Sequence, residues 1–124
     1  MKTEELQIGG VFLISNFFHE DNRGLFVKPF TNIVDSLKEL HFETKEIYYS
    51  ISQKGVIRGM HFQCPPMDHS KLIYLTSGKI TDVLLDLRKS SKSYKNHIAI
   101  DLSAHNSALF IPSGIAHGFL SKEE

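Results

Sequence analysis

Apolar and polar residues alternate in short runs through most of the chain. Beyond residue 45 these runs are rich in β-branched and aromatic residues, and joints containing Gly, Ser, Asn or Pro separate them. The predicted strands cover residues 11–15, 25–30, 46–52, 56–63, 72–76, 79–87, 97–102, 108–111 and 118–120. Residues 16–23 are predicted to form a loop, and 11–15 to lie at a sheet edge. Short strands with turn signals between them are typical of a sandwich or barrel, so the pattern predicts an all-β fold.

One segment has a helical period instead. In residues 31–40 (TNIVDSLKEL), Ile33, Leu37 and Leu40 recur at helical spacing, and Thr31 or Asn32 can cap the start. The sequence therefore predicts one short helix near residues 31–40, covering one end of the barrel.

Composition limits the classes of function. The chain has 124 residues, enough for a single domain over 1–124. Its 14 Lys and Arg balance 14 Asp and Glu, so no overall field favours nucleic acid or an anionic membrane. Cys64 is the only cysteine, and the chain shows neither a transmembrane run nor the apolar core of a signal peptide. A cytoplasmic location is expected.

Polar side chains suited to chemistry gather in two stretches, residues 55–78 and 112–119. The spacing of Gly55, His61, Gln63, Lys71 and Gly78 resembles the first motif of the cupin superfamily, and PSGIAHGF resembles the second. Where metal cupins carry His, His, Glu and His, this chain has His61, Gln63, Lys71 and His117. A protonated lysine offers no lone pair to a cation, so we expect no metal and no cofactor.

Several further motifs in one order narrow the resemblance. DNRGLF (21–26), RGMHFQ (58–63), DVLLDLRKSS (82–91) and IPSGIAHGF (111–119) together resemble the dTDP-4-dehydrorhamnose 3,5-epimerase family. The resemblance implies a cupin double-stranded β-helix (jelly roll), a homodimer, and metal-free action on a nucleotide-linked 4-keto-6-deoxy sugar. It places the protein in deoxysugar or surface-polysaccharide biosynthesis, such as that of lipopolysaccharide O-antigen. The family's proton-donating tyrosine and the aspartate that pairs with its catalytic histidine follow the second motif, so the domain is expected to be truncated at its C-terminus.

Two residues are the expected catalytic groups. His61 is the candidate base, because a largely neutral imidazole can abstract a proton next to a ketone. Lys71 is the candidate partner of the enolate oxygen, where a fixed cation stabilises the developing charge. Outside this motif context, a lone strand histidine and a strand-starting lysine are more often packing or surface residues.

The remaining candidates bind substrate. Arg58 and His117 are expected on the phosphate side, because a guanidinium fork matches phosphate oxygens. The resemblance implies that Arg23 and Phe26 contact the nucleotide, and Ser50 and Gln63 are lesser polar candidates. Arg58 and His61 are an odd number of residues apart, which in a regular strand places them on opposite faces. Both can reach one cavity if Gly59 forms a bulge.

Three functions stay open on the sequence. The first is a sugar-nucleotide epimerase that abstracts the proton next to the ketone. The second is a related ketoisomerase on the same substrate class, and the third is a non-catalytic cupin that binds a nucleotide sugar. Lys28, Ile47, Tyr48 and Ile51 depart from the family's pattern near the expected substrate contacts.

Overall fold

The structure, a computed structural model, describes residues 1–31 and 39–123. Its ten strands are β1 (Lys2–Glu5), β2 (Phe12–Ser15), β3 (Phe18–Asp21), β4 (Gly24–Val27), β5 (Ile57–His61), β6 (Lys71–Tyr74), β7 (Lys79–Asp86), β8 (His97–Ser103), β9 (Ser107–Ile111) and β10 (Ile115–Ser121). The prediction of an all-β fold is confirmed.

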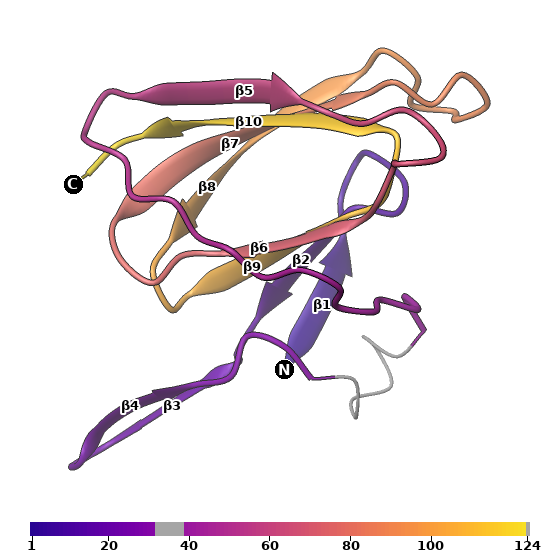
Figure 1. Cartoon of the computed structure of the whole chain (residues 1–124). Coiled ribbons are helices and arrows are strands. Elements are labelled where there is room, and N and C mark those ends of the chain that lie inside the picture. The colour runs from indigo at the N-terminus through magenta and orange to yellow at the C-terminus, as the bar shows by residue number, and fades with distance from the viewer. Residues whose placement is uncertain (32–38, 124) are drawn as a thin grey trace.

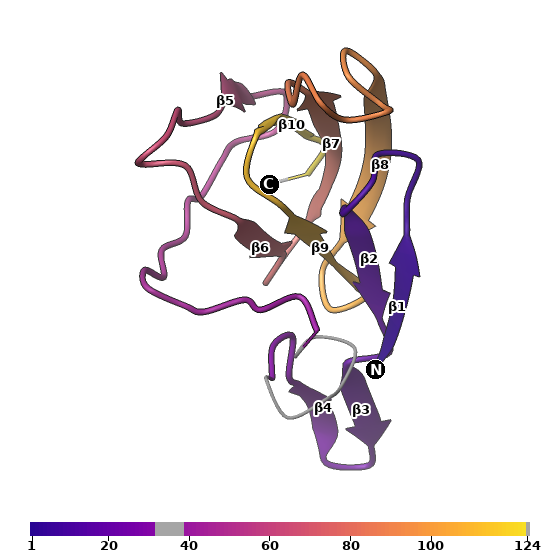
Figure 2. The same cartoon turned by 90° about the vertical axis from the view of Figure 1, so that its right-hand side faces the viewer.

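Two four-stranded antiparallel sheets face each other (Figure 1). One has the order β1-β2-β9-β6 and the other β5-β10-β7-β8, so sequence neighbours repeatedly lie in different sheets. The hairpin β3–β4 forms a separate ribbon that projects away from the sandwich (Figure 1). Viewed along the sandwich, β5 and β6 lie on one side and β1 and β8 on the other (Figure 2).

The core fills the space between the sheets. Strand β7 shows the cause most clearly, because its alternate residues, from Ile80 to Asp86, are buried while those between them are more exposed. Leu84 packs there with Leu102 of β8 and Leu109 of β9, all nearly inaccessible to water. Burying each such side chain stabilises the fold by about 1.5–3 kcal/mol.

The predicted helix is not found. The described residues contain no helix: Thr31 has no regular structure, and residues 39–41 form a turn. Residues 32–38, the centre of the prediction, lie outside the described residues. Leu40 packs on a small cluster around Phe110, so its apolar character serves packing in a turn.

Three further predictions are wrong, and one strand was not predicted. Residues 46–52 alternate like a strand but pair with none in the described part of the chain, and nearly all are exposed. Residues 18–21, predicted as loop, form β3, because pairing with β4 compensates for a polar sequence. Residues 11–15 were predicted at an edge, but β1 pairs outside β2. Strand β1 (KTEE) is largely exposed and carries no apolar signal.

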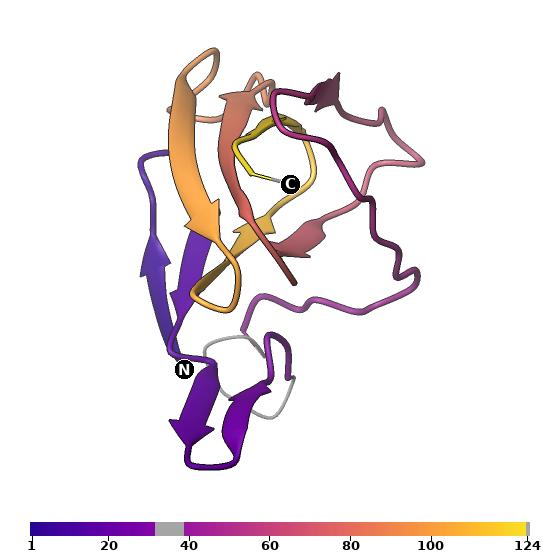
Figure 3. The ribbon, with the colours of Figure 1, turned by 90° about the vertical axis from the view of Figure 1, so that its left-hand side faces the viewer.

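A buried carboxylate organises the loop between β7 and β8, whose backbone is the orange loop at the top of Figure 3. Asp86 is fully buried and accepts hydrogen bonds from the Arg88 guanidinium at 3.0 Å and the hydroxyls of Ser91 at 2.7 Å and Ser93 at 2.6 Å. Burial by itself raises the pKa of Asp86, but these hydrogen bonds outweigh it and hold the pKa well below its usual range. Arg88 also donates to the carbonyl of Gly9 at 2.7 Å, which ties the loop to the N-terminal segment.

Candidate active site

Two histidines meet across neighbouring strands. Strand β10 pairs antiparallel with β5, and His117 lies directly opposite His61. Directly paired residues point to the same face of a sheet. On its other side His117 lies opposite Leu84, whose side chain is in the core, so this face is the interior one. The sheet register therefore brings the first and second motifs together on one face of the sheet.

A bulge places Arg58 on the same face. The pairing moves from His117–His61 to Phe119–Arg58, two steps along β10 but three along β5. The extra residue turns Arg58 back to the face of His61, although an odd spacing in a regular strand would place the two on opposite faces. Gly59 makes this possible, because its φ is +120° and a Cβ there would lie 2.5 Å from the Cα of Gly118. The predicted bulge at Gly59 is confirmed.

His117 is held by a buried carboxylate. Its Nε2 lies 2.8 Å from Oδ2 of Asp82, which comes from the centre of β7 and is fully buried. An ionised carboxylate only accepts hydrogen bonds, so Nε2–H is the donor. The side chain of His117 keeps 11% of its surface exposed. Its ring also lies 6.3 Å from that of Phe119.

Asp82 also interacts electrostatically with Lys71. Burial raises the pKa of the Asp82 carboxyl, while the hydrogen bond and charge of His117 and the charge of Lys71 act to lower it. Asp82 was not among the residues predicted for the site. The signal for it was present, because a charged residue occupies an inward position of β7 between Ile80 and Leu84.

Lys71 and His61 come from the two strands that flank one side of the sandwich. His61 ends β5 and Lys71 begins β6, and residues 62–70 connect them (Figure 2). Lys71 is half-buried and pairs with Ile111 of β9. His61 is exposed. Base and ammonium candidates thus belong to different sheets, with Asp82 and His117 in the layer between the sheets.

Arg58 is oriented by the segment that precedes β5. Its Nε donates to the Ser52 hydroxyl at 2.9 Å and its Nη2 to the carbonyl of Ile51 at 3.3 Å. Ser52, like Ser50, is a lesser candidate for polar contacts on the sequence, and in the structure it holds the guanidinium of Arg58. Ser50 itself and Gln63, just beyond β5, are both exposed.

Arg23 and Phe26 lie apart from the other candidates. Both belong to the β3–β4 hairpin, which follows β2 and projects away from the sandwich (Figure 1). Arg23 binds the carboxylate of Asp21 through Nη2 at 2.6 Å, and this contact holds the pKa of Asp21 below its usual range. Phe26 is 62% exposed, with the Lys28 ammonium 5.8 Å from its ring centre. Phe26 is therefore not a core residue.

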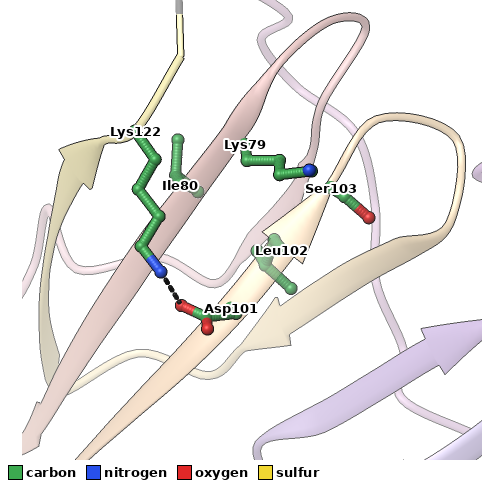
Figure 4. Close-up of a pocket in the computed structure, with 6 residues that line it drawn as sticks. All are labelled: Lys79, Ile80, Asp101, Leu102, Ser103 and Lys122. Carbon is green, nitrogen blue, oxygen red and sulfur yellow. Dashed lines mark hydrogen bonds and ion pairs between the residues drawn. The ribbon is translucent and has the colours of Figure 1, made fainter. Parts of the chain in front are cut away.

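A surface hollow elsewhere has a different character. Its lining residues are Lys79, Ile80, Asp101, Leu102, Ser103 and Lys122 (Figure 4). Both lysines there are paired, Lys122 with Asp101 at 3.0 Å and Lys79 with Glu123 at 3.2 Å. With its cations already engaged, this hollow is a poor anion site.

Two further observations concern metals and membranes. Over residues 1–31 and 39–123, no three His, Cys, Asp or Glu side chains are grouped as metal ligands would be. Within the same residues, no helix is long and apolar enough to cross a membrane.

Comparison with known proteins gives a consistent result. The sequence model of a family described as dTDP-4-dehydrorhamnose 3,5-epimerase matches residues 5–124. The enzyme of that name from Shigella flexneri is 34% identical over 121 residues, covering 96% of this chain and 67% of the relative. The one from Methanothermobacter thermautotrophicus is 36% identical over 115 residues, covering 92% of this chain and 62% of the relative. The chain therefore spans 62–67% of the length of these two relatives.

Solved structures agree with the sequence comparisons. The Sulfolobus tokodaii dTDP-4-dehydrorhamnose 3,5-epimerase superposes with a TM-score of 0.86 at 33% identity, covering 99% of this chain and 70% of that one. An epimerase of Mycobacterium tuberculosis gives a TM-score of 0.89 at 29% identity, covering 100% of this chain and 63% of that one. A Legionella pneumophila relative, with a TM-score of 0.85 at 28% identity, covering 98% of this chain and 65% of that one, was solved in complex with dTDP-4-keto-L-rhamnose.

Proposed function

Because this chain belongs to the dTDP-4-dehydrorhamnose 3,5-epimerase family, we propose that it acts on a 4-keto-6-deoxy sugar nucleotide by removing the proton next to the ketone. The observation that carries the proposal is the interior face shared by Arg58, His61 and His117 across β5 and β10. The complex of the Legionella relative with dTDP-4-keto-L-rhamnose supports the substrate class. The facing antiparallel sheets agree with the expected cupin jelly roll.

His61 is the base in this proposal and Lys71 the oxyanion partner. A neutral imidazole takes the proton from the carbon next to the ketone, and the electron pair moves to the carbonyl oxygen as an enolate. The Lys71 ammonium, on the facing sheet, stabilises that charge more in the transition state than in the ground state. Epimerisation is complete when a donor returns a proton to the opposite face of the same carbon.

Arg58 binds the diphosphate, and His117 lines the pocket beside it. The contacts of Arg58 with Ser52 and Ile51 hold its guanidinium in place before substrate arrives. A guanidinium fixed in advance loses little freedom on binding phosphate oxygens. Gln63 and Ser50 are proposed as further polar contacts, near the sugar and the segment before β5.

A homodimer is part of the proposal. The hairpin that carries Arg23 and Phe26 points away from the sandwich, so these residues serve the nucleotide bound by a second copy. An exposed apolar band accompanies this, with Ile47, Tyr49 and Ile51 each more than 80% exposed. A band of that kind marks an interaction surface. A cytoplasmic location stays a prediction.

The test is proton exchange in deuterated water. The protein is incubated with dTDP-4-keto-6-deoxyglucose, and loss of ring-proton signals is followed by NMR together with the yield of inverted sugar. We expect exchange next to the ketone, abolished by His61→Asn. The matched control is His97→Asn, an exposed histidine at the far edge of the same sheet, which should leave exchange unchanged.

Other outcomes would select the alternatives. Binding without exchange favours a non-catalytic nucleotide-sugar protein. Formation of a keto group at a different carbon favours a ketoisomerase. Exchange that survives His61→Asn means that another group is the base.

A further inference from the structure

We propose that Asp82 is a positioning residue for His117, fixing which ring nitrogen faces the substrate. Asp82 is outside the set of groups that act on substrate in the proposed function, and it contacts one of the proposed site residues, His117. The inference rests on the proposed function only where it concerns nucleotide binding. The expected effect on the tautomer of His117 rests on the contact between Asp82 and His117.

The contact determines the tautomer. Oδ2 of Asp82 and Nε2 of His117 are 2.8 Å apart, and both residues are buried. The carboxylate can only accept, so a neutral His117 carries its proton on Nε2. Nδ1 is then the ring atom that remains for a ligand. Leu84 lies opposite His117 on β7, and the ring of Phe119 lies beside that of His117.

The second oxygen of Asp82 sets it apart from an ordinary structural carboxylate. Oδ1 is buried and has no hydrogen-bond partner within the described chain. Asp86 lies on the same face of the same strand, and both of its oxygens accept hydrogen bonds. Arg88 by itself already donates to each of the two. A buried acceptor without a partner is unfavourable for folding and is found where function requires it. Asp82 therefore serves the site, whereas Asp86 serves the loop.

The charges around the pair fit this role. His61 faces His117 from β5, and Lys71 of β6 acts on Asp82 through its charge. Asp82 interacts with both His117 and Lys71. It holds His117 by a hydrogen bond and neutralises part of the positive field in which Lys71 must stay protonated.

The first experiment reads the tautomer without any ligand. Nitrogen-15 NMR of the histidine rings is recorded above neutral pH for the wild type, Asp82→Asn and Asp82→Leu, with His117→Gln to assign the signal. We expect Nε2–H for His117 in the wild type and a mixture of tautomers in both variants, because an amide can accept or donate and leucine does neither. An unchanged His117 tautomer in both variants overturns the proposal.

The second experiment measures dTDP affinity by calorimetry in a double-mutant cycle. Asp82→Asn should weaken binding about tenfold, as coupled neighbours typically do, and should add nothing further once His117→Gln is present. Equal losses with and without His117 overturn the proposal, since Asp82 would then act by another route. If wild-type protein does not bind dTDP, the proposed function fails, while the tautomer experiment still decides the role of Asp82.

Matched variants separate positioning from folding. Asp82→Asn removes a buried charge that burial disfavours, as the raised pKa of Asp82 indicates, so its melting temperature should stay close to that of the wild type. Asp86→Asn changes the other buried carboxylate of β7 and should lower the melting temperature while leaving the His117 tautomer as it is. If Asp82→Asn lowers stability as Asp86→Asn does and leaves the tautomer intact, the role of Asp82 is structural.

Discussion

At Gly59 the backbones of β5 and β10 approach so closely that no side chain fits between them. A Cβ on Gly59 would lie 2.5 Å from Gly118, and one on Gly118 would lie 2.9 Å from the Arg58 carbonyl. This approach creates the bulge that turns Arg58 to the face of His61. Two residues without side chains thus decide whether Arg58 and His61, the proposed phosphate ligand and base, share a face of the sheet.

Gly59→Ala should therefore destabilise the fold and disturb the site. Gly24→Ala is the matched control. The φ of Gly24 is +121°, nearly equal to the +120° of Gly59, but a Cβ added at Gly24 would have no atom within 4 Å. The control isolates the backbone strain, about 1–3 kcal/mol, and we expect Gly59→Ala to exceed it clearly. Urea unfolding of both variants measures the difference. Equal losses would mean that the close approach to Gly118 has no energetic weight.

Arg58→Ala should weaken dTDP binding more than His61→Ala. Charge-assisted hydrogen bonds are worth about 1.5–3 kcal/mol, which corresponds to a loss of about tenfold or more in affinity. Calorimetry on both variants measures it, with Lys92→Ala in the exposed loop between β7 and β8 as a control for net charge. A similar loss for Lys92→Ala would point to a general electrostatic effect and not to a phosphate contact.

At the scale of elements, β7 carries two buried carboxylates whose pKa values move in opposite directions. The pKa of Asp82 is raised, so what this group contributes to stability is present below about pH 4 and fades as pH rises through its folded pKa. The pKa of Asp86 is lowered, so its contribution is present above about pH 4 and is lost as pH falls through its folded pKa. The same strand therefore stabilises the fold through one carboxylate and supplies the site with the other.

Asp86→Asn should destabilise the protein most near neutral pH, by about 3 kcal/mol, because it breaks a buried charged network. The difference from the wild type should shrink on acidification below about pH 4, since protonation then removes the same interactions from the wild type. Urea unfolding between pH 2 and 7 follows this convergence. A difference that stays constant over the whole range would show that the charge of Asp86 is not what stabilises the loop.

For the molecule as a whole, two exposed features underlie the proposed homodimer. The β3–β4 hairpin extends beyond the sandwich, and the residues before β5 present Ile47, Tyr49 and Ile51 to water. An isolated copy with these surfaces would tend to aggregate.

Ile51→Asp should therefore shift the protein from dimer to monomer. The charge would have to be buried in the interface, which is costly without a partner. Sedimentation velocity over a series of concentrations measures the shift. Tyr94→Asp, in the loop between β7 and β8, is the control and should stay dimeric. A wild type that is monomeric at all concentrations would contradict the proposal.

The sequence predicted the parts of this protein in which local pattern and tertiary position agree. The alternation of β7 and the bulge at Gly59 follow from spacing and residue type alone. Strand β1 could not be predicted, because its polar residues pair only through their backbone. The contact of Asp82 with His117 joins positions 35 residues apart and depends on the register of β7 with β10. The exposed residues 46–52 misled the prediction, because an alternating apolar pattern does not specify what will cover it.

Strand β5 is an edge strand, and every one of its five residues is exposed. Its amide groups are held by hydrogen bonds to β10 alone, whereas β7 is bonded on both sides. The strand that carries His61, the proposed base, is thus among the easiest to open, and its amide hydrogens should exchange with solvent sooner than those of β7. A sugar nucleotide that touches His61 on β5 and Lys71 on β6 would join the free edges of the two sheets. Occupancy of the site would then be visible in the backbone itself, as slower hydrogen exchange along β5.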